Sequence, residues 1–107
     1  MPANRPEGTA LDGPWRPLDE QIRREQAEAI GQSGRRLRRA MDALAAFDRG
    51  ERRGEREPLL GEAAEALRGY TIQKELLGAP DDALVTQVYG VTPEVWQATG
   101  LIRRGRR

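Results

Sequence analysis

The chain has 107 residues, with 18 basic and 17 acidic side chains and neither cysteine nor histidine. This length fits a single domain of about 100–150 residues, and the balanced charge argues against a disordered chain. Because Cys and His are missing, disulfides, the favoured zinc and copper ligands and the usual nucleophile–base pairs are excluded. We therefore expect no metal, no cofactor and no enzyme, and a carboxylate-based activity is the one catalytic alternative left open.

Residues 1–17 carry four prolines and two glycines among few apolar side chains, which predicts a flexible segment. They hold no apolar run of the length of a secretory signal, and no stretch of the chain approaches the roughly 20 apolar residues that cross a bilayer. We therefore expect a cytoplasmic protein without a membrane partner. Trp15 either folds back over the start of the first helix, which we favour, or belongs to a short docking peptide.

The first predicted helix covers residues 18–48, and its apolar residues recur with heptad spacing on one side. We interpret this stripe as a candidate self-association seam, which consists of Ile22, Ile30, Gly34, Leu37, Met41 and Leu44. A glycine inside a helix costs about 1 kcal/mol relative to alanine. Gly34 on the seam therefore indicates close approach of another backbone, and a kink at residues 31–34 is the alternative.

A charged loop over residues 49–57 is expected to reverse the chain into a second helix at 58–77, with Pro58 in its first turn and Gly78 at its end. Its expected core face is Leu60, Ala63, Ala64, Leu67, Tyr70 and Thr71. Ile72 and Leu76 point to the other side, so the second half of this helix is expected to be covered on two sides. Lys74 is expected to bury its stem and to keep its amine in solvent.

Two short helices are predicted near 82–89 and 93–99. Asp81 or Asp82 caps the first, and Thr92 caps the second. Val95 and Trp96 are expected to pack on the second face of the central helix, near Ile72 and Leu76. The fold class is thus all-α, a long antiparallel helical hairpin capped by two short C-terminal helices. We expect one helical domain at 18–100, a basic tail at 101–107, and mobile ends at 1–14 and 103–107.

Four stretches of the sequence, residues 18–31, 43–48, 62–75 and 89–95, resemble a family of small bacterial all-helical proteins of unknown function. The resemblance covers residues 18–100, and its motifs are patterns of helical core residues, not of reactive groups. It implies the fold and no activity, and it assigns no functional residue.

The leading hypothesis is a non-catalytic helical interaction module, a homo-oligomer or the partner of another helical protein. Leu, Ile, Val and Phe number only 20, and 14 alanines bury little area each, so the core is thin. The first helix is also longer than the second. This leaves apolar positions such as Ile22 exposed, unless another chain or a folded-back Trp15 covers them.

The alternative is a helix-turn-helix-like nucleic-acid-binding protein that uses residues 82–107. Two short helices around a tight turn at Gly90 have this outline, and a basic tail follows that can contact phosphates. Its candidate nucleic-acid contacts are Arg103, Arg104, Arg106 and Arg107. Against it, the second helix offers Glu94, Gln97 and Thr99 but no basic side chain. The arginines at 35–39 are interpreted as solvated surface, with an anion site as the alternative.

Overall fold

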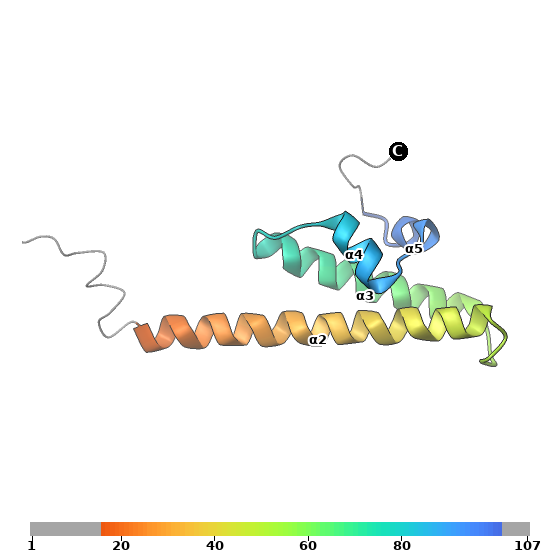
Figure 1. The fold of residues 1–107 in the computed structure, drawn as a ribbon, viewed down its shortest axis with the longest axis horizontal. Coiled ribbons are helices and arrows are strands. Elements are labelled where there is room, and N and C mark those ends of the chain that lie inside the picture. Colours follow the sequence, from red (N-terminus) through yellow and green to blue (C-terminus); the bar gives the residue numbers. More distant parts are fainter. Residues whose placement is uncertain (1–15, 102–107) are drawn as a thin grey trace, which may run out of the picture. The chain divides into compact units, whose positions relative to one another are not determined.

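The computed structural model describes residues 16–101, and Figure 1 shows the helices of this part of the chain. They are α2 (Arg16–Asp48), α3 (Arg56–Leu76), α4 (Asp82–Tyr89) and α5 (Pro93–Ala98), and no strand occurs between residues 16 and 101. The predicted fold class is confirmed, because a long helix pairs with a second one and two short helices follow. The predictions on Trp15 and on the mobile ends lie outside the described residues.

The helix boundaries differ from the predicted ones by two residues or fewer. Helices α2 and α3 both begin two residues earlier than predicted, so Pro58 is the third residue of α3 and not its first. Helix α4 has the predicted bounds, and α5 ends at Ala98, one residue early. A proline is tolerated anywhere in the first helical turn, because the N–H groups there have no partner inside the helix.

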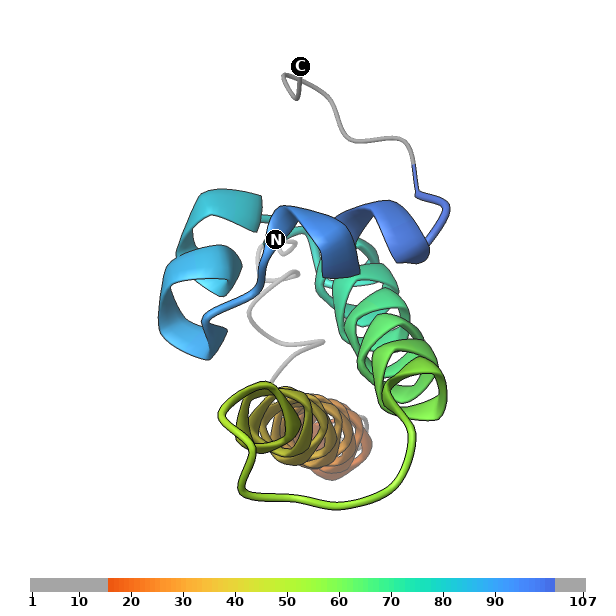
Figure 2. The ribbon, with the colours of Figure 1, turned by 90° about the vertical axis from the view of Figure 1, so that its right-hand side faces the viewer.

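The chain divides into two compact units, residues 1–31 and 32–107, and the border falls inside α2. In the second unit, the C-terminal half of α2 and helices α3, α4 and α5 surround a common centre (Figure 2). Eleven buried apolar residues fill this centre: Leu37, Ala40, Met41, Leu44, Ala63, Ala66, Leu67, Val85, Val91, Val95 and Trp96. Each helix turns its apolar face toward this centre, as the spacing of its apolar residues indicates.

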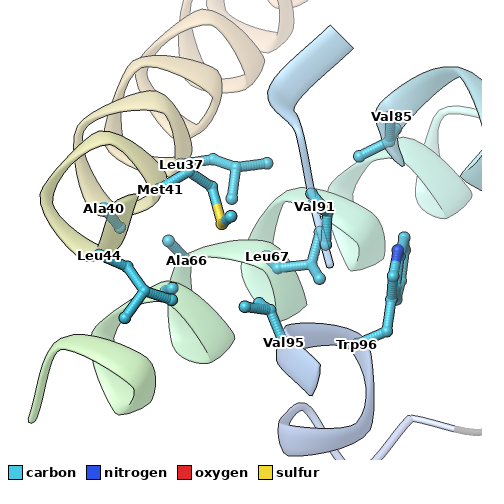
Figure 3. Close-up of a cluster of buried hydrophobic side chains, with 11 residues drawn as sticks. Leu37, Ala40, Met41, Leu44, Ala66, Leu67, Val85, Val91, Val95 and Trp96 are labelled. Atoms are coloured by element: carbon cyan, nitrogen blue, oxygen red, sulfur yellow. The ribbon is translucent and has the colours of Figure 1, made fainter. Parts of the chain in front are cut away.

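The expectation that α3 is covered on two sides is wrong. Ile72 and Leu76 are 40% and 81% exposed. Trp96 is buried as predicted, but it packs in the main core, with Leu67, Val91 and Val95 beside it (Figure 3). Its indole N–H donates a hydrogen bond to Thr86 Oγ1 at 2.8 Å, which ties α5 to α4 rather than to the far side of α3.

The connection between α4 and α5 forms as its sequence predicts. Asp81, not Asp82, caps α4 through a hydrogen bond from Leu84 N–H, and Thr92 caps α5 through Val95 N–H. Between the two caps, Gly90 adopts a left-handed conformation with φ +66°, which a residue with a side chain rarely adopts. This tight turn brings Val91 into the core directly after α4 ends.

Gly34 is buried in an unbroken stretch of α2. A neighbouring tyrosine explains why a glycine occupies this position. A Cβ atom at Gly34 would lie 2.6 Å from the hydroxyl oxygen of Tyr89 and 3.4 Å from the ring of Tyr70. These two rings meet edge to face, with centroids 5.4 Å apart. The predicted close approach is therefore real, but it is made by the side chain of Tyr89 and not by another backbone.

Residues 16–31 lie in the first unit, and none of them is fully buried. Leu18 and Ile22 are 48% and 44% exposed, and Ile30 is half-buried. Arg16 and Glu20 form an ion pair of 3.1 Å at the i,i+4 spacing, which supports a helix by a few tenths of a kcal/mol. This half of α2 thus has a helical backbone and no core of its own among the described residues.

Candidate functional site

The predicted self-association seam is divided between the two units. Gly34, Leu37, Met41 and Leu44 are buried in the core of the chain's own second unit. A second copy therefore cannot reach these four residues while that core is intact. Only Ile22 and Ile30, both in the first unit, keep exposed surface.

A narrower candidate surface lies on residues 16–31 of α2. Leu18, Ile22 and Ala29 follow one another at spacings of four and seven residues, which places them on one side of a helix. We call this set the N-terminal face of α2. Leu18 and Ile22 present almost half of their surface to solvent, and Ala29 is partly covered. Sequence reasoning found Ile22 but missed Leu18, because Leu18 stands at the predicted helix start.

Helices α4 and α5 have the predicted helix–turn–helix outline, but α5 has only six residues. Its Val95 and Trp96 are buried, and no basic side chain occurs from residue 82 to residue 101. The candidate contacts Arg103, Arg104, Arg106 and Arg107 lie outside the described residues. Exposed polar groups thus remain on α5, but residues 82–101 offer no basic side chain to a phosphate.

Glu94 at the start of α5 is engaged within the fold. Two nitrogens of the Arg56 guanidinium lie 2.8 Å from its two carboxylate oxygens, and Arg56 also contacts Asp48 at 2.8 Å. The hydrogen bond from Arg56 lowers the pKa values of Asp48 and Glu94, and both carboxylates raise the pKa of Arg56. We call these three residues the Arg56 cluster. It links the end of α2, the start of α3 and the start of α5.

Sequence reasoning missed the Arg56 cluster. Arg56 stands in a run of charged residues, where neighbours such as Arg52 and Arg53 look equivalent. The contact between Arg56 and Asp48 could have been inferred, because the short loop after α2 brings the start of α3 back to the end of α2. The partner in α5 depends on the tertiary fold, which no local pattern reveals.

Two of the four arginines at residues 35–39 also have partners in the fold. Arg36 pairs with Glu62 of α3 at 3.0 Å, and Arg38 donates to the carbonyl oxygen of Val88 at 2.8 Å. The guanidinium of Arg38 lies 4.8 Å from the centroid of the Tyr89 ring. These contacts use Arg36 and Arg38 to hold α3 and α4 against α2, so the four arginines do not form one open anion site.

Tyr89, Tyr70 and Lys74 form a half-buried cluster of titratable side chains. Burial and hydrogen bonding with Tyr70 raise the pKa of the Tyr89 phenol. The amine of Lys74 lies 6.0 Å from the centroid of the Tyr70 ring, and Lys74 as a whole is half-buried, as expected from its long stem. A raised phenol pKa keeps Tyr89 protonated at neutral pH.

Two hollows on the surface of the second unit are lined by described residues. One, of about 410 Å³, lies beside the end of α2 and includes Met41, Leu44, Arg56 and Tyr89 in its lining. The other, of about 350 Å³, lies between α3 and α5. Residues 16–101 contain no cluster of three or more His, Cys, Asp or Glu side chains that could hold a metal ion.

No helix within residues 16–101 is long and apolar enough to span a membrane. The model of one protein family, described as a family of unknown function (DUF6665), matches residues 5–107. No curated protein and no solved structure matches the chain.

Proposed function

We propose that this chain, which belongs to the family of unknown function DUF6665, is a non-catalytic helical module that self-associates through the N-terminal face of α2. One observation carries the proposal: residues 16–31 are helical, yet Leu18 and Ile22 remain almost half exposed on one side of that helix. A cytoplasmic location is part of the same proposal.

The physical argument is that this half of α2 needs a partner. In proteins, tertiary packing of an apolar face supplies most of the stability of a helix. The core of the second unit contains no residue of the segment 16–31. A covering surface for Leu18 and Ile22 would supply the missing packing.

A second copy of the chain is the occupant that we propose for this face. In a two-fold symmetric dimer each copy presents the same surface to the other, so apolar meets apolar. Residues 16–31 carry three basic and four acidic side chains, so two copies meet without strong repulsion. The face is small compared with the roughly 800 Å² per partner of a standard interface. We therefore expect a weak dimer whose population depends on concentration.

Light scattering over a concentration series tests this proposal. The wild-type mass should rise from monomer toward dimer, and Ile22→Glu should keep the chain monomeric. Leu76→Glu is the matched control, because Leu76 is an exposed leucine of the second unit, and this variant should dimerise like the wild type. A wild type that stays monomeric at all concentrations, or loss of the dimer in Leu76→Glu alone, would contradict the proposal.

Trp15 is the competing occupant of the same face, seven residues before Ile22 in the sequence. If it covered the face within one chain, the wild type would be a monomer, and Trp15→Ala would lower the stability of α2. If a second copy covers the face, Trp15→Ala leaves a concentration-dependent mass. The two outcomes separate the alternatives in one titration.

The second candidate function is nucleic-acid binding through residues 82–107. The observation in its favour is the tight turn between α4 and α5, which has the predicted outline. Affinity should then fall steeply with salt, and replacement of Arg103, Arg104, Arg106 and Arg107 by Gln should reduce this dependence. Replacement of the exposed Arg35 and Arg39 by Gln is the control. Absence of binding at low salt would remove this candidate.

A further inference from the structure

The hollow between α3 and α5 is a groove with a floor of small and apolar residues. Leu60, Gly61 and Ala64 of α3 line it on one side, and Ala98 and Thr99 at the end of α5 line it on the other. Apart from the adjacent residues and backbone of α3 itself, no atom lies within 4 Å of the position that a Cβ would take on Gly61, so the floor is open at this point. A methylene chain or one aliphatic side chain fits a volume of about 350 Å³.

The rim of this groove is acidic. Glu57 and Glu65 both line it, and both are exposed. Glu65 also acts on Arg36 of α2 through space, whereas Arg36 makes its direct ion pair with Glu62. The two carboxylates are eight residues apart on α3, about 12 Å along the helix. Arg68 is the one basic side chain of the lining, and its guanidinium donates to the carbonyl oxygen of Thr99 at 3.3 Å. An occupant with basic side chains therefore suits the rim.

The chain's own C-terminal segment begins at the mouth of the groove. Thr99 lines the groove, Leu101 is half-buried, and residues 102–107 follow directly. This segment reads Ile-Arg-Arg-Gly-Arg-Arg, one aliphatic residue followed by four arginines. Six residues reach about 20 Å when extended, which is enough to pass both glutamates.

We propose that residues 102–107 bind in the α3–α5 groove of the same chain, with Ile102 on the floor and the arginines on Glu57 and Glu65. The short covalent connection gives the segment a high effective concentration at the groove, so weak contacts suffice. Exposed ion pairs are screened by salt, and the docked state therefore loses population as ionic strength rises. Bound in this way, the arginines are withheld from any anionic partner.

Limited trypsin digestion of the full chain, followed by mass spectrometry, tests this proposal. The rate of cleavage after Arg103 and Arg104 is divided by the rate after Arg52 and Arg53, exposed residues of the loop before α3 that serve as an internal standard. Removal of both carboxylates in Glu57→Gln/Glu65→Gln should raise this ratio about two- to thirty-fold, the range expected for two exposed ion pairs. Glu28→Gln, on α2, is the control and should leave the ratio unchanged.

Two outcomes would overturn the proposal. If the ratio is the same in the wild type, the double variant and the control, residues 102–107 do not use the groove. If the protection depends on protein concentration, the segment binds a second copy and not its own chain. A salt-dependent protection that is independent of concentration and lost in the double variant is the expected result.

Discussion

The two halves of α2 have similar apolar patterns and different surroundings. In residues 32–48 the apolar positions are covered by the same chain, and Leu37 is fully buried. In residues 16–31 Leu18 and Ile22 keep almost half of their surface exposed. Periodicity thus indicates that a helix has an apolar face to cover, but not which chain covers it.

The ion pairs of the two halves differ in the same way. Arg16 and Glu20 are four residues apart on one helix, so their contact supports only local structure. Arg36 and Glu62 are 26 residues apart, and the Arg56 cluster joins three helices. Contacts of the second kind report on the tertiary fold, whereas those of the first kind survive in an isolated helix. We expect residues 16–31 to open at a lower free-energy cost than residues 32–48.

Truncation of Trp96 is expected to have the largest effect on stability, because Trp96 is the largest buried side chain of the core. The side chain is 2% exposed and hydrogen-bonded to Thr86. Trp96→Ala should lower the free energy of unfolding by about 3–5 kcal/mol, measured by urea unfolding. Leu76→Ala, at an exposed site, is the control and should change it by less than about 0.5 kcal/mol. An unchanged unfolding midpoint for Trp96→Ala would mean that α5 is not part of the core.

The direct test of the comparison uses one substitution in each half of α2. Leu37→Ala should cost about 2–5 kcal/mol, because it leaves a cavity in the core. Ile22→Ala should cost less than about 0.5 kcal/mol at concentrations where the chain is a monomer. At high concentration the cost of Ile22→Ala should grow, because the wild type is then stabilised by association. Equal costs in dilute solution would show that residues 16–31 have a cover within the chain.

Much of the fold could be predicted from the sequence, because its signals are local. Asp81 and Thr92 cap helices, and Gly90 takes the conformation that ends α4. The heptad spacing gave Leu37, Met41 and Leu44 as apolar positions of one face, and all three are buried. Such features depend on a few neighbouring residues, so periodicity and turn chemistry suffice to find them.

The errors concern contacts between distant residues. Ile72 was expected to be covered by Trp96, but the hydrogen bond of Trp96 to Thr86 holds α5 on the other side of α3. Gly34 was matched with a backbone, and the structure places Tyr89 there, 55 residues further along the chain. Arg56 and Glu94 are likewise far apart in the sequence, separated by 38 residues. Charge and helical spacing indicate which residues could form such pairs, but the tertiary fold determines which of them meet.

Substitution of one glycine in α2 and one in α3 tests whether Tyr89 is the reason for glycine at position 34. Gly34→Ala brings a methyl group to 2.6 Å from the Tyr89 hydroxyl, and Arg38 and Tyr70 limit how far that ring can move. We expect a net loss of about 1 kcal/mol, since overpacking exceeds the gain in helix propensity. Gly69→Ala in α3 meets nothing within 4 Å and should gain about 0.5–1 kcal/mol. Thermal unfolding compares the two, and a gain at both positions would contradict this account.

The smallest predicted effect is the response of the Arg56 cluster to acid. Arg56 lowers the pKa values of Asp48 and Glu94 below their ordinary values of 3.8 and 4.5. The folded state therefore binds these two protons less readily than the unfolded state does. The stabilisation is present above about pH 4.5 and is lost as the pH falls through the folded pKa values. Urea unfolding between pH 3 and pH 6 should show this loss, reduced in Arg56→Gln and in high salt. Arg49→Gln, which breaks the local pair with Glu51, is the control and should retain the part due to Asp48 and Glu94. If Arg56→Gln keeps the full wild-type dependence, the cluster does not couple the three helices.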